Sequence, residues 1–460
     1  GGPIMCPMKY FLLLGVFAAP IFVISHAATW SAVFTPSVIK VEMHRQAEIK
    51  LDLRGLESVR VTEIVLKTAD TIVAVVDKVI PATEITDGTW SGSFNVSGVF
   101  LGKTDLFVEI TTMDNAKEQS EERLGVTVVR EERAIDKVFT YTVAILVGIL
   151  YINFGAALDL KLLKTIVTCP IGPAIGVFGQ FVVMPLLSFG IGKLIFPDSH
   201  AMQLGMFFTG VSPAGGASNV WTAVLNGNIN LSVLMTTIST IAAFGLMPMW
   251  IFTLGKVIFD QGELTVPYAR IGEFALVLIF PLLIGLIIQR YLPRVTRILV
   301  LVLKPVASLL ILFIVIFAIV TNLYLFELFS WQIVVSGLLL PWLGFLLGWT
   351  IAKLFRQVPA DALAIAVETG IQNTGISIFL LRFTLPQPEA DLTTVAPVSV
   401  AIMTPVPLFI LYIILKIKER LNRSKRELLH EKAETADLSI DSQETLPQDQ
   451  EIAKNRTEVP

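Results

Sequence analysis

Long apolar runs between residues 138 and 418 constrain the fold of this sequence more than any other feature. A helix needs about 20 apolar residues to cross a bilayer, and segments of that kind follow one another through this region. Of the 460 residues, 54% are hydrophobic and only 16% are charged, whereas soluble domains carry about 25% charged residues. The chain has too little polar surface for a soluble enzyme. We therefore predict a polytopic membrane protein.

Nine segments are predicted to span the membrane as helices, which makes 138–418 an all-α membrane domain. They lie near 138–158, 171–194, 202–225, 229–253, 269–290, 301–323, 331–353, 362–381 and 394–416. Cytoplasmic loops carry an excess of lysine and arginine, which gives an independent test of orientation. The predicted inner side carries Lys161, Lys164, Arg290, Arg294, Arg297, Lys353, Arg356, Lys416, Lys418, Arg420, Arg423, Lys425 and Arg426. The predicted outer side carries only Lys193, Lys256, Arg270 and Arg382.

Residues 1–27 have the pattern of a secretory signal peptide. Lys9 precedes a short apolar run that ends at Ile24, and small residues follow it up to Ala28. The alternative is an uncleaved signal anchor, which leaves everything downstream on the same side of the membrane. Either way, the segment that follows is expected to be lumenal or extracellular.

Residues 29–135 are predicted to form a β-sandwich. Seven short segments rich in Val, Ile, Thr and Phe, separated by turn residues, lie at 37–43, 47–53, 58–66, 71–76, 89–96, 104–111 and 123–130. Such spacing is typical of immunoglobulin or fibronectin domains. The segment contains no cysteine, which favours the fibronectin-like variant. Asn95-Val96-Ser97 is an N-glycosylation sequon, so Asn95 is a predicted glycosylation site.

The remaining composition excludes several classes of function. A net charge of −3 argues against nucleic-acid binding. Four histidines and two cysteines leave almost nothing for a zinc site or a disulfide framework. The tail 419–460 becomes acidic and poor in apolar residues, which is typical of disorder. The basic stretch that opens it is interpreted as a topology and lipid-headgroup anchor rather than as a specific site.

Two predicted spans are interrupted by residues that weaken a helix. The third contains proline and glycine between Ser212 and Val220, and the eighth contains two glycines between Glu368 and Gly375. Backbone groups freed inside a membrane must line a cavity or meet a ligand. A pair of such spans indicates the substrate site of a secondary transporter with inverted repeats. The alternative for the third span, a small-residue packing face, does not explain Glu368.

Glu368 is the only carboxylate predicted deep in a span, and no lysine or arginine lies at comparable depth. A charge there costs about 2.5–3.5 kcal/mol and is normally functional. Its partner is expected to be a mobile cation or a proton. Neutral oxygens at Gln180, Ser232, Thr236 and Gln372 suit a hard monovalent cation. Individually, each of these side chains can instead bond to its own helix or bridge two helices.

The sequence resembles the bile acid:sodium symporter family over roughly 138–418. The matching motifs are Gly215-Gly216-Ala217-Ser218-Asn219-Val220, Gly227-Asn228, Leu231-Ser232 with Thr236, Glu368-Thr369-Gly370-Ile371-Gln372-Asn373, and Gln180-Phe181-Val182-Val183-Met184-Pro185-Leu186. The resemblance implies two broken helices that cross at mid-membrane. It also implies a core domain of spans two to four and seven to nine, and a panel domain of spans one, five and six.

The same resemblance implies sodium (Na⁺) as the coupling ion, bound at two sites. The first site would use Ser218, Asn219, Ser232, Thr236 and Glu368. The second would use Gln180, Glu368, Gln372 and the backbone carbonyls of Thr369 and Ile371. Gly216, Ala217 and Asn373 are implied near the substrate. Gly216 departs from the family pattern, because some relatives have a threonine there. The β-rich N-terminal domain is similar to the orphan branch of the family rather than to the hepatic and ileal carriers.

The function predicted is sodium-coupled symport of an organic anion, such as a bile acid or steroid sulfate, by alternating access. Coupling to protons through Glu368, instead of to sodium, is an alternative that stays open. Assembly into a homo-oligomer also stays open. The alternative is a non-transporting membrane protein whose lumenal β-domain binds a partner. An intramembrane protease would need paired aspartates or a His-rich motif in the spans, which are absent. The location predicted is the plasma membrane or a secretory-pathway membrane.

The topology is testable through its two ends. We expect Asn95 to carry a glycan, so glycosidase treatment should shift the wild-type chain on a gel but not the Asn95→Gln variant. A tag placed after residue 460 should be reached by antibody only in permeabilised cells. Staining of that tag in intact cells would contradict the nine-span orientation.

Overall fold

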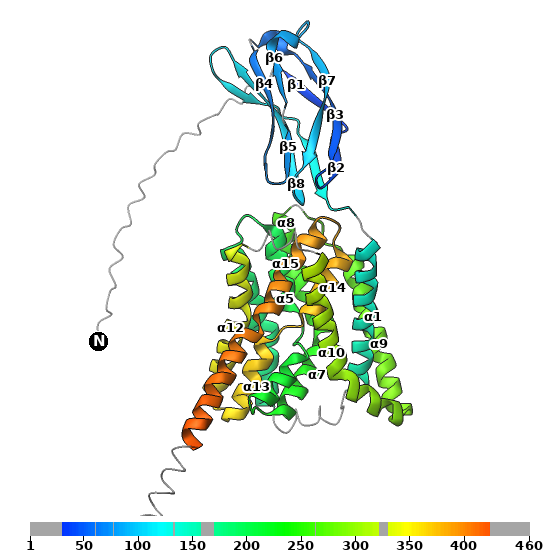
Figure 1. The fold of residues 1–460 in the computed structure, drawn as a ribbon, viewed down its shortest axis with the longest axis vertical. Helices are drawn as coiled ribbons and strands as arrows, with labels where there is room; N and C mark the ends of the chain where they lie inside the picture. The colour runs from blue at the N-terminus through cyan, green and yellow to red at the C-terminus, as the bar shows by residue number, and fades with distance from the viewer. Residues whose placement is uncertain are drawn as a thin grey trace, which may run out of the picture. The chain divides into compact units, whose positions relative to one another are not determined.

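The computed structural model describes residues 30–131, 134–157, 170–262, 264–321 and 330–423, apart from residues 60 and 77. The chain divides into two compact units, and the boundary in the sequence lies between Arg130 and Glu131. The first consists of strands and the second of helices (Figure 1). The predicted signal peptide, most of the predicted tail, and the basic residues Lys161, Lys164, Lys425 and Arg426 lie outside the described residues.

The N-terminal unit contains two β-sheets. The strands of the four-stranded sheet, in spatial order, are β1 (Ser31–Thr35), β3 (Gln46–Arg54), β7 (Trp90–Gly98) and β5 (Ala74–Val76). Those of the other sheet are β2 (Val38–Glu42), β10 (Leu124–Val129), β8 (Gly102–Thr112), β4 (Val61–Thr68) and β6 (Val79–Pro81), with β9 (Lys117–Gln119) also paired to β8. The neighbouring pairs are antiparallel except β2 and β10, which run parallel.

Alternating side chains from both sheets enclose one hydrophobic core. In β3, Ile49, Leu51 and Leu53 are buried, while Lys50 between them is exposed. Ile64 of β4 and Ile110 of β8 meet this core from the other sheet. The period of two in the sequence thus places one face of each sheet inside.

Each of the seven predicted strands coincides with an observed one, but the structure adds β1, β6 and β9. Two of these have only three residues, too short for alternation to reveal. The predicted segment 71–76 forms only β5, after which the chain crosses to the other sheet as β6. Asn95 lies on β7 with an exposed side chain.

The second unit is helical. Its elements are α1 (Ala134–Ala157), α3 (Ile171–Phe178), α4 (Met184–Ile195), α5 (His200–Val211), α6 (Ala217–Val224), α7 (Ile229–Trp250), α8 (Lys256–Gln261), α9 (Tyr268–Tyr291), α10 (Pro293–Thr321), α12 (Trp331–Leu354), α13 (Pro359–Gly370), α14 (Thr374–Thr384) and α15 (Glu389–Met403). A further helix over 405–423 continues α15. π-helical turns at Gly179–Val183 and Ile251–Gly255 join α3 to α4 and α7 to α8.

Five helical segments of the described residues are long and apolar enough to cross a membrane, which agrees with a multi-pass membrane protein. They are Ile171–Ile195, Ile229–Gln261, Tyr268–Tyr291, Trp331–Leu354 and Glu389–Arg423. The other predicted spans also coincide with helical segments, two of them broken: α5 with α6, and α13 with α14. The number of crossings and their direction stay predictions.

Helix packing in this unit forms two sets. α1 packs against α9 and α10, and α4, α5, α12, α13 and α15 pack among themselves. Within the first set, α1 and α9 approach each other closely at Gly155 and Gly285. A Cβ atom at Gly155 would lie only 2.2 Å from the carbonyl oxygen of Leu282 in α9. This grouping is compatible with the expected panel and core, which stay a prediction.

The structure buries two carboxylates that the sequence analysis overlooked. The last predicted span began at residue 394, whereas α15 begins at Glu389 and so includes Asp391. Both side chains are buried, and Asp391 Oδ1 lies 3.0 Å from Arg382 Nη2 of α14. Arg382, expected as an ordinary outer-side charge, is therefore part of a buried ion pair. Acidic residues in the first turn of a helix are stabilised by its dipole.

The β unit should fold independently. Its core draws on both sheets and its residues include no cysteine, so neither the membrane unit nor a disulfide is needed to complete it. Residues 29–135 expressed alone should give a β-type circular dichroism spectrum and a cooperative melt that reductant does not change. A disordered spectrum would show that the core depends on the rest of the chain.

Candidate functional site

The two helix breaks cross and hydrogen-bond to each other. The amide of Gly215 donates to the carbonyl of Ile371 at 2.8 Å, and the amide of Asn373 donates to the carbonyl of Pro213 at 2.9 Å. Ala214 and Gln372 thus form an isolated antiparallel β-bridge between segments that are far apart in sequence. Backbone groups that lost their helical partners satisfy one another here, as an apolar environment requires.

Glycine is required at position 215 because of this crossing. A Cβ atom there would lie 2.8 Å from the carbonyl oxygen of Gln372. Ser239 of α7 supports the same segment, since its hydroxyl accepts a hydrogen bond from the amide of Ala214 at 2.8 Å. The motif that suggested a broken helix therefore fixes the contact between the two breaks.

Two half-helices begin at the crossing. α6 starts at Ala217, and α14 starts at Thr374 with Asn373 as its cap, whose Oδ1 accepts from the amide of Ile376 at 3.2 Å. Helix N-termini carry a partial positive charge from the aligned backbone dipoles. The crossing is thus a place where two positive helix ends meet inside the bundle.

A first cluster forms around Glu368, which is 2% exposed in α13. Its Oε1 accepts a hydrogen bond from Thr236 Oγ1 at 2.5 Å, and its Oε2 lies 3.0 Å from Ser232 Oγ. Ser232 Oγ also lies 2.8 Å from Asn219 Oδ1, but a hydroxyl has only one proton to donate. Three acceptor oxygens of Glu368 and Asn219 therefore share two hydroxyl hydrogens.

The charge of Glu368 has no cationic partner among the described residues. No lysine, arginine or histidine of those ranges forms an ion pair with it. Ser218 at the start of α6 is fully buried, and its hydroxyl lies near the carboxylate without a well-aligned hydrogen bond to it. Buried polar atoms normally find partners, so this oxygen is one that a bound ion could use.

A second cluster forms around Gln180, which lies in the π-helical turn between α3 and α4. Its Nε2 donates to the carbonyl of Ser212 at 2.7 Å and to Gln372 Oε1 at 2.6 Å. Gln372 Nε2 donates in turn to the carbonyl of Thr369 at 2.9 Å. Gln180 Oε1 is buried and has no hydrogen-bond partner, so this cluster also holds one unsatisfied oxygen.

The structure groups the predicted ligands around Glu368 and around Gln180, but among the described residues Glu368 makes hydrogen bonds only in the first of these clusters. Each carbonyl at Thr369 and Ile371 already accepts one hydrogen bond, which leaves one lone pair on each. Within the described part of the chain, every hydrogen bond of Glu368 stays in the first cluster. The expected sharing of Glu368 between two sites is therefore not seen in its hydrogen bonds.

Sequence reasoning missed several supporting contacts. Thr222 Oγ1 donates to Ser232 Oγ at 3.3 Å. Asn228 caps α7 through the amide of Leu231 and donates to Asp361 Oδ1 at 2.7 Å, which ties α7 to the start of α13. The Gly227-Asn228 motif gave a signal for the cap but none for Asp361, which lies more than 130 residues further along the chain.

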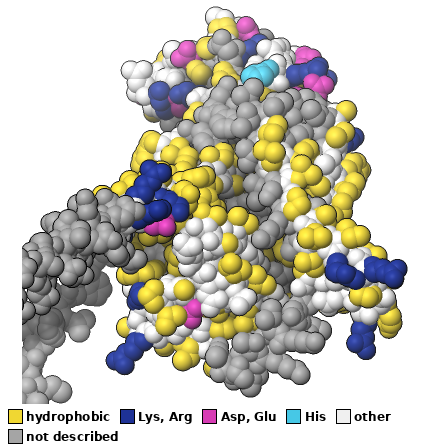
Figure 2. Space-filling view, turned by 60° about the horizontal axis from the view of Figure 1, so that its bottom comes forward, with side chains coloured by type: hydrophobic (Ala, Val, Ile, Leu, Met, Phe, Trp, Pro, Cys, Tyr) yellow, Lys and Arg dark blue, Asp and Glu magenta, His cyan; other side chains and the backbone are white. Residues whose placement is uncertain are grey.

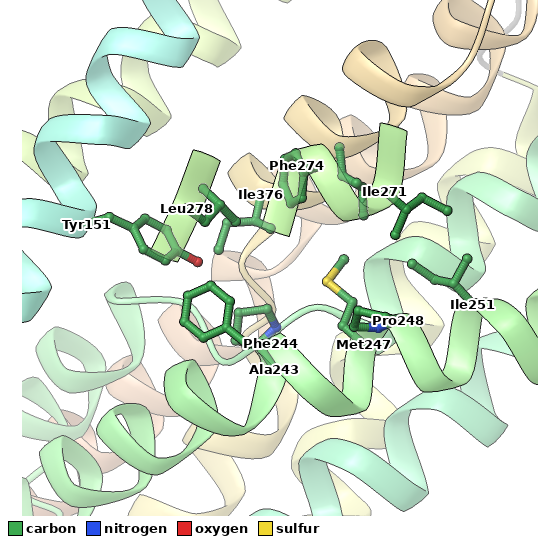
Figure 3. Close-up of a pocket in the computed structure, with 12 residues that line it drawn as sticks. Tyr151, Ala243, Phe244, Met247, Pro248, Ile251, Ile271, Phe274, Leu278 and Ile376 are labelled. Atoms are coloured by element: carbon green, nitrogen blue, oxygen red, sulfur yellow. The ribbon is translucent and has the colours of Figure 1, made fainter. Parts of the chain in front are cut away.

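A narrow cavity lies beside the crossing (Figure 3). It is lined by Tyr151 of α1, by Phe274 and Leu278 of α9, and by Phe244 of α7, and Pro213 of the first break closes it. The Tyr151 hydroxyl points inward and is the polar group seen among apolar side chains (Figure 3). The volume is about 20 Å³, room for about one water molecule.

Position 216 has space for a side chain, since the nearest atom to a Cβ there would be Phe154 Cζ at 3.8 Å.

Comparison with known proteins finds relatives that are similar to part of this chain. Residues 144–327 match the family described as Sodium Bile acid symporter family. The human P3 protein is 30% identical over 261 residues, 56% of this chain and 54% of that protein. The rat Hepatic sodium/bile acid cotransporter is 29% identical over 55% of this chain and 70% of that protein, and the rabbit Ileal sodium/bile acid cotransporter is 29% identical over 56% and 73%.

These matches have a defined extent. The chain spans about half the length of the P3 proteins it matches, and the name P3 protein states no substrate. The family is one of transporters rather than enzymes. The family resemblance predicted from the sequence motifs is confirmed by these matches. Residues 144–327 therefore resemble the sodium bile acid symporter family, and the relatives that the chain matches include sodium/bile acid cotransporters.

Proposed function

We propose that this chain is a sodium-coupled symporter of an organic anion. The observation that carries the proposal is Glu368, a buried carboxylate without a cationic partner, held by hydroxyl groups beside two crossing helix breaks. Leaving an isolated charge in a low-dielectric interior is costly, and a bound cation offsets that cost. In a coupled cycle the ion would bind and leave with each turnover. The carboxylate would then be compensated only while the ion is bound.

The first sodium ion would bind among Ser218, Asn219, Ser232, Thr236 and Glu368. Every ligand atom there is a hard oxygen, which suits a small monovalent cation rather than a soft metal. The unpartnered Ser218 hydroxyl and the surplus of acceptors around Asn219 support this assignment. On binding, the hydroxyls of Ser232 and Thr236 would turn their lone pairs toward the ion.

The second ion would bind around Gln180 and Gln372, with carbonyl oxygens of Thr369 and Ile371. The free Oε1 of Gln180 supports a ligand role. Gln372 contributes its side chain to this cluster and its backbone to the bridge with Ala214. Binding of the ion would therefore bear directly on the geometry of the crossing.

The substrate would be an amphipathic anion. The N-termini of α6 and α14 offer positive helix ends to a carboxylate or sulfate, near Gly216, Ala217 and Asn373. The neighbouring cavity presents aromatic and aliphatic side chains to an apolar body, with Tyr151 as its polar group. At about 20 Å³ this cavity is too small for such a molecule. Helices α1 and α9 must therefore separate from α7 for substrate to enter, as alternating access requires.

Uptake measurements test the proposed function directly. Cells that express the chain should take up labelled bile acids, steroid sulfates or related organic anions in sodium medium and not in choline medium. Uptake that follows a pH gradient in choline medium would favour proton coupling instead. A lack of uptake for the whole panel, together with a partner captured by the isolated β unit, would favour the interaction-protein alternative.

We expect Glu368→Gln to abolish sodium-dependent uptake while surface expression is kept, because the variant keeps the shape and removes the charge. Ser232→Ala and Thr236→Ala each remove one neutral ligand, a contact to a charged group worth about 1.5–3 kcal/mol. The sodium concentration for half-maximal uptake should therefore rise roughly tenfold or more.

Glu273→Gln is the matched control, because Glu273 is exposed on α9, away from both clusters. It should behave as wild type. Full sodium dependence in the Glu368→Gln variant would remove the carboxylate from the coupling site.

The second cluster should act separately from the first. Gln180→Ala and Gln372→Ala are expected to lower the Hill coefficient for sodium toward one, because only one ion would then be bound tightly. Gln203→Ala provides the control, since Gln203 is equally buried but bonds to the carbonyl of Phe196. A Hill coefficient that stays at its wild-type value in both variants would exclude a second ion at Gln180.

A further inference from the structure

An apolar groove lies on the membrane unit, separate from the cavity beside the crossing. It has a volume of about 660 Å³, within the range of about 300–1,000 Å³ usual for ligand sites. We call it the α12–α15 groove, because its walls are α12, α13 and the 405–423 helix that continues α15. Its lining includes Trp342, Trp349, Leu363, Leu411 and Leu415.

Both long walls of the groove end in a lysine on the same helical face. On α12, Trp342 and Trp349 line the groove and Lys353 follows Trp349 by four residues, one turn further. On the 405–423 helix, Leu411 and Leu415 line the groove and Lys418 follows by three residues. Both lysines are exposed, and Figure 2 shows basic side chains in separate groups around this end of the unit.

The environment of these lysines favours an anion. Lys353 Nζ lies 6.0 Å from the centre of the Trp349 ring, so its charge is held at the mouth of the groove. Glu419, next to Lys418 in the chain, pairs with Lys416 at 2.9 Å, and no ion pair among the described residues involves Lys353 or Lys418. Lys353 and Lys418 are therefore available to a negatively charged headgroup.

We propose that the α12–α15 groove binds an anionic phospholipid. An acyl chain would lie along Trp342, Leu346 and Leu411, and the phosphate would meet Lys353 and Lys418. A general basic anchor would not require a preformed apolar cavity aligned with two particular lysines. Val367 also lines the groove one residue before Glu368, so the lipid would contact the half-helix that carries the carboxylate.

Thermal unfolding of the purified full chain in detergent tests this proposal. Dioctanoyl phosphatidylserine should raise Tm saturably, at concentrations at least fivefold lower than dioctanoyl phosphatidylcholine. Lys353→Gln and Lys418→Gln should each weaken the effect of the serine lipid by roughly fivefold. Leu411→Trp should obstruct the path proposed for the acyl chain and weaken the effect while it leaves the charges in place.

Arg420→Gln separates this site from general attraction to the headgroup. It removes the same charge from the same helix. Because a helix turns by about 100° per residue, Arg420 lies on the face opposite Lys418 and Leu411. Arg420→Gln should leave the lipid effect unchanged. Equal losses for Arg420→Gln and Lys418→Gln would overturn the proposal, and so would equal effects of the two lipids. A full effect of glycerophosphoserine, which has no acyl chains, would also overturn it.

Discussion

A buried carboxylate and broken backbone in an apolar interior are the constraint on which the membrane unit depends. Neither Glu368 nor the peptide groups of the two breaks can turn to water for partners. The peptide groups of the two breaks hydrogen-bond to each other, Gly215 with Ile371 and Asn373 with Pro213. Glu368 is satisfied only in part, because hydroxyls of α7 reach the carboxylate but no cationic side chain of the described residues does.

The paired breaks and the two polar clusters share elements of the fold, which would link ion binding at the proposed sites to the position of the helices. Gln372 bonds to Gln180 through its side chain and lies in the bridge to Ala214 through its backbone. Ser239 and Ser232, both on α7, serve the bridge and the carboxylate respectively. A change in how Glu368 or Gln180 is coordinated is therefore felt by the segments from which α6 and α14 begin. Such a connection is what coupling of an ion to an anionic substrate requires.

The sequence revealed the parts of this arrangement that local chemistry encodes. Proline and glycine after Ser212 marked one break, and the glycines at 370 and 375 marked the other, while the isolated carboxylate of Glu368 marked the candidate ion site. Alternation likewise marked β3 and β7, which are long enough to show it. The three-residue strands β6 and β9 carry too few positions for a period to appear.

Contacts between distant segments were beyond sequence reasoning from one chain. Ser232 and Glu368 are 136 residues apart, and only the family resemblance suggested that they meet. Nothing local indicated that Asp391 is buried against Arg382, because the acidic start of α15 has the composition of a loop. The α12–α15 groove depends on three helices whose spacing no local pattern describes.

Sodium binding to the purified wild-type chain, without substrate, tests the central claim most directly. Thermal unfolding should be followed in sodium, potassium and choline chloride at one ionic strength. We expect a saturable rise in Tm in sodium alone, since an ion bound to the native state at 100 times its Kd adds about 2.7 kcal/mol to the free energy of unfolding. Identical unfolding curves in the three salts would contradict a sodium site at Glu368.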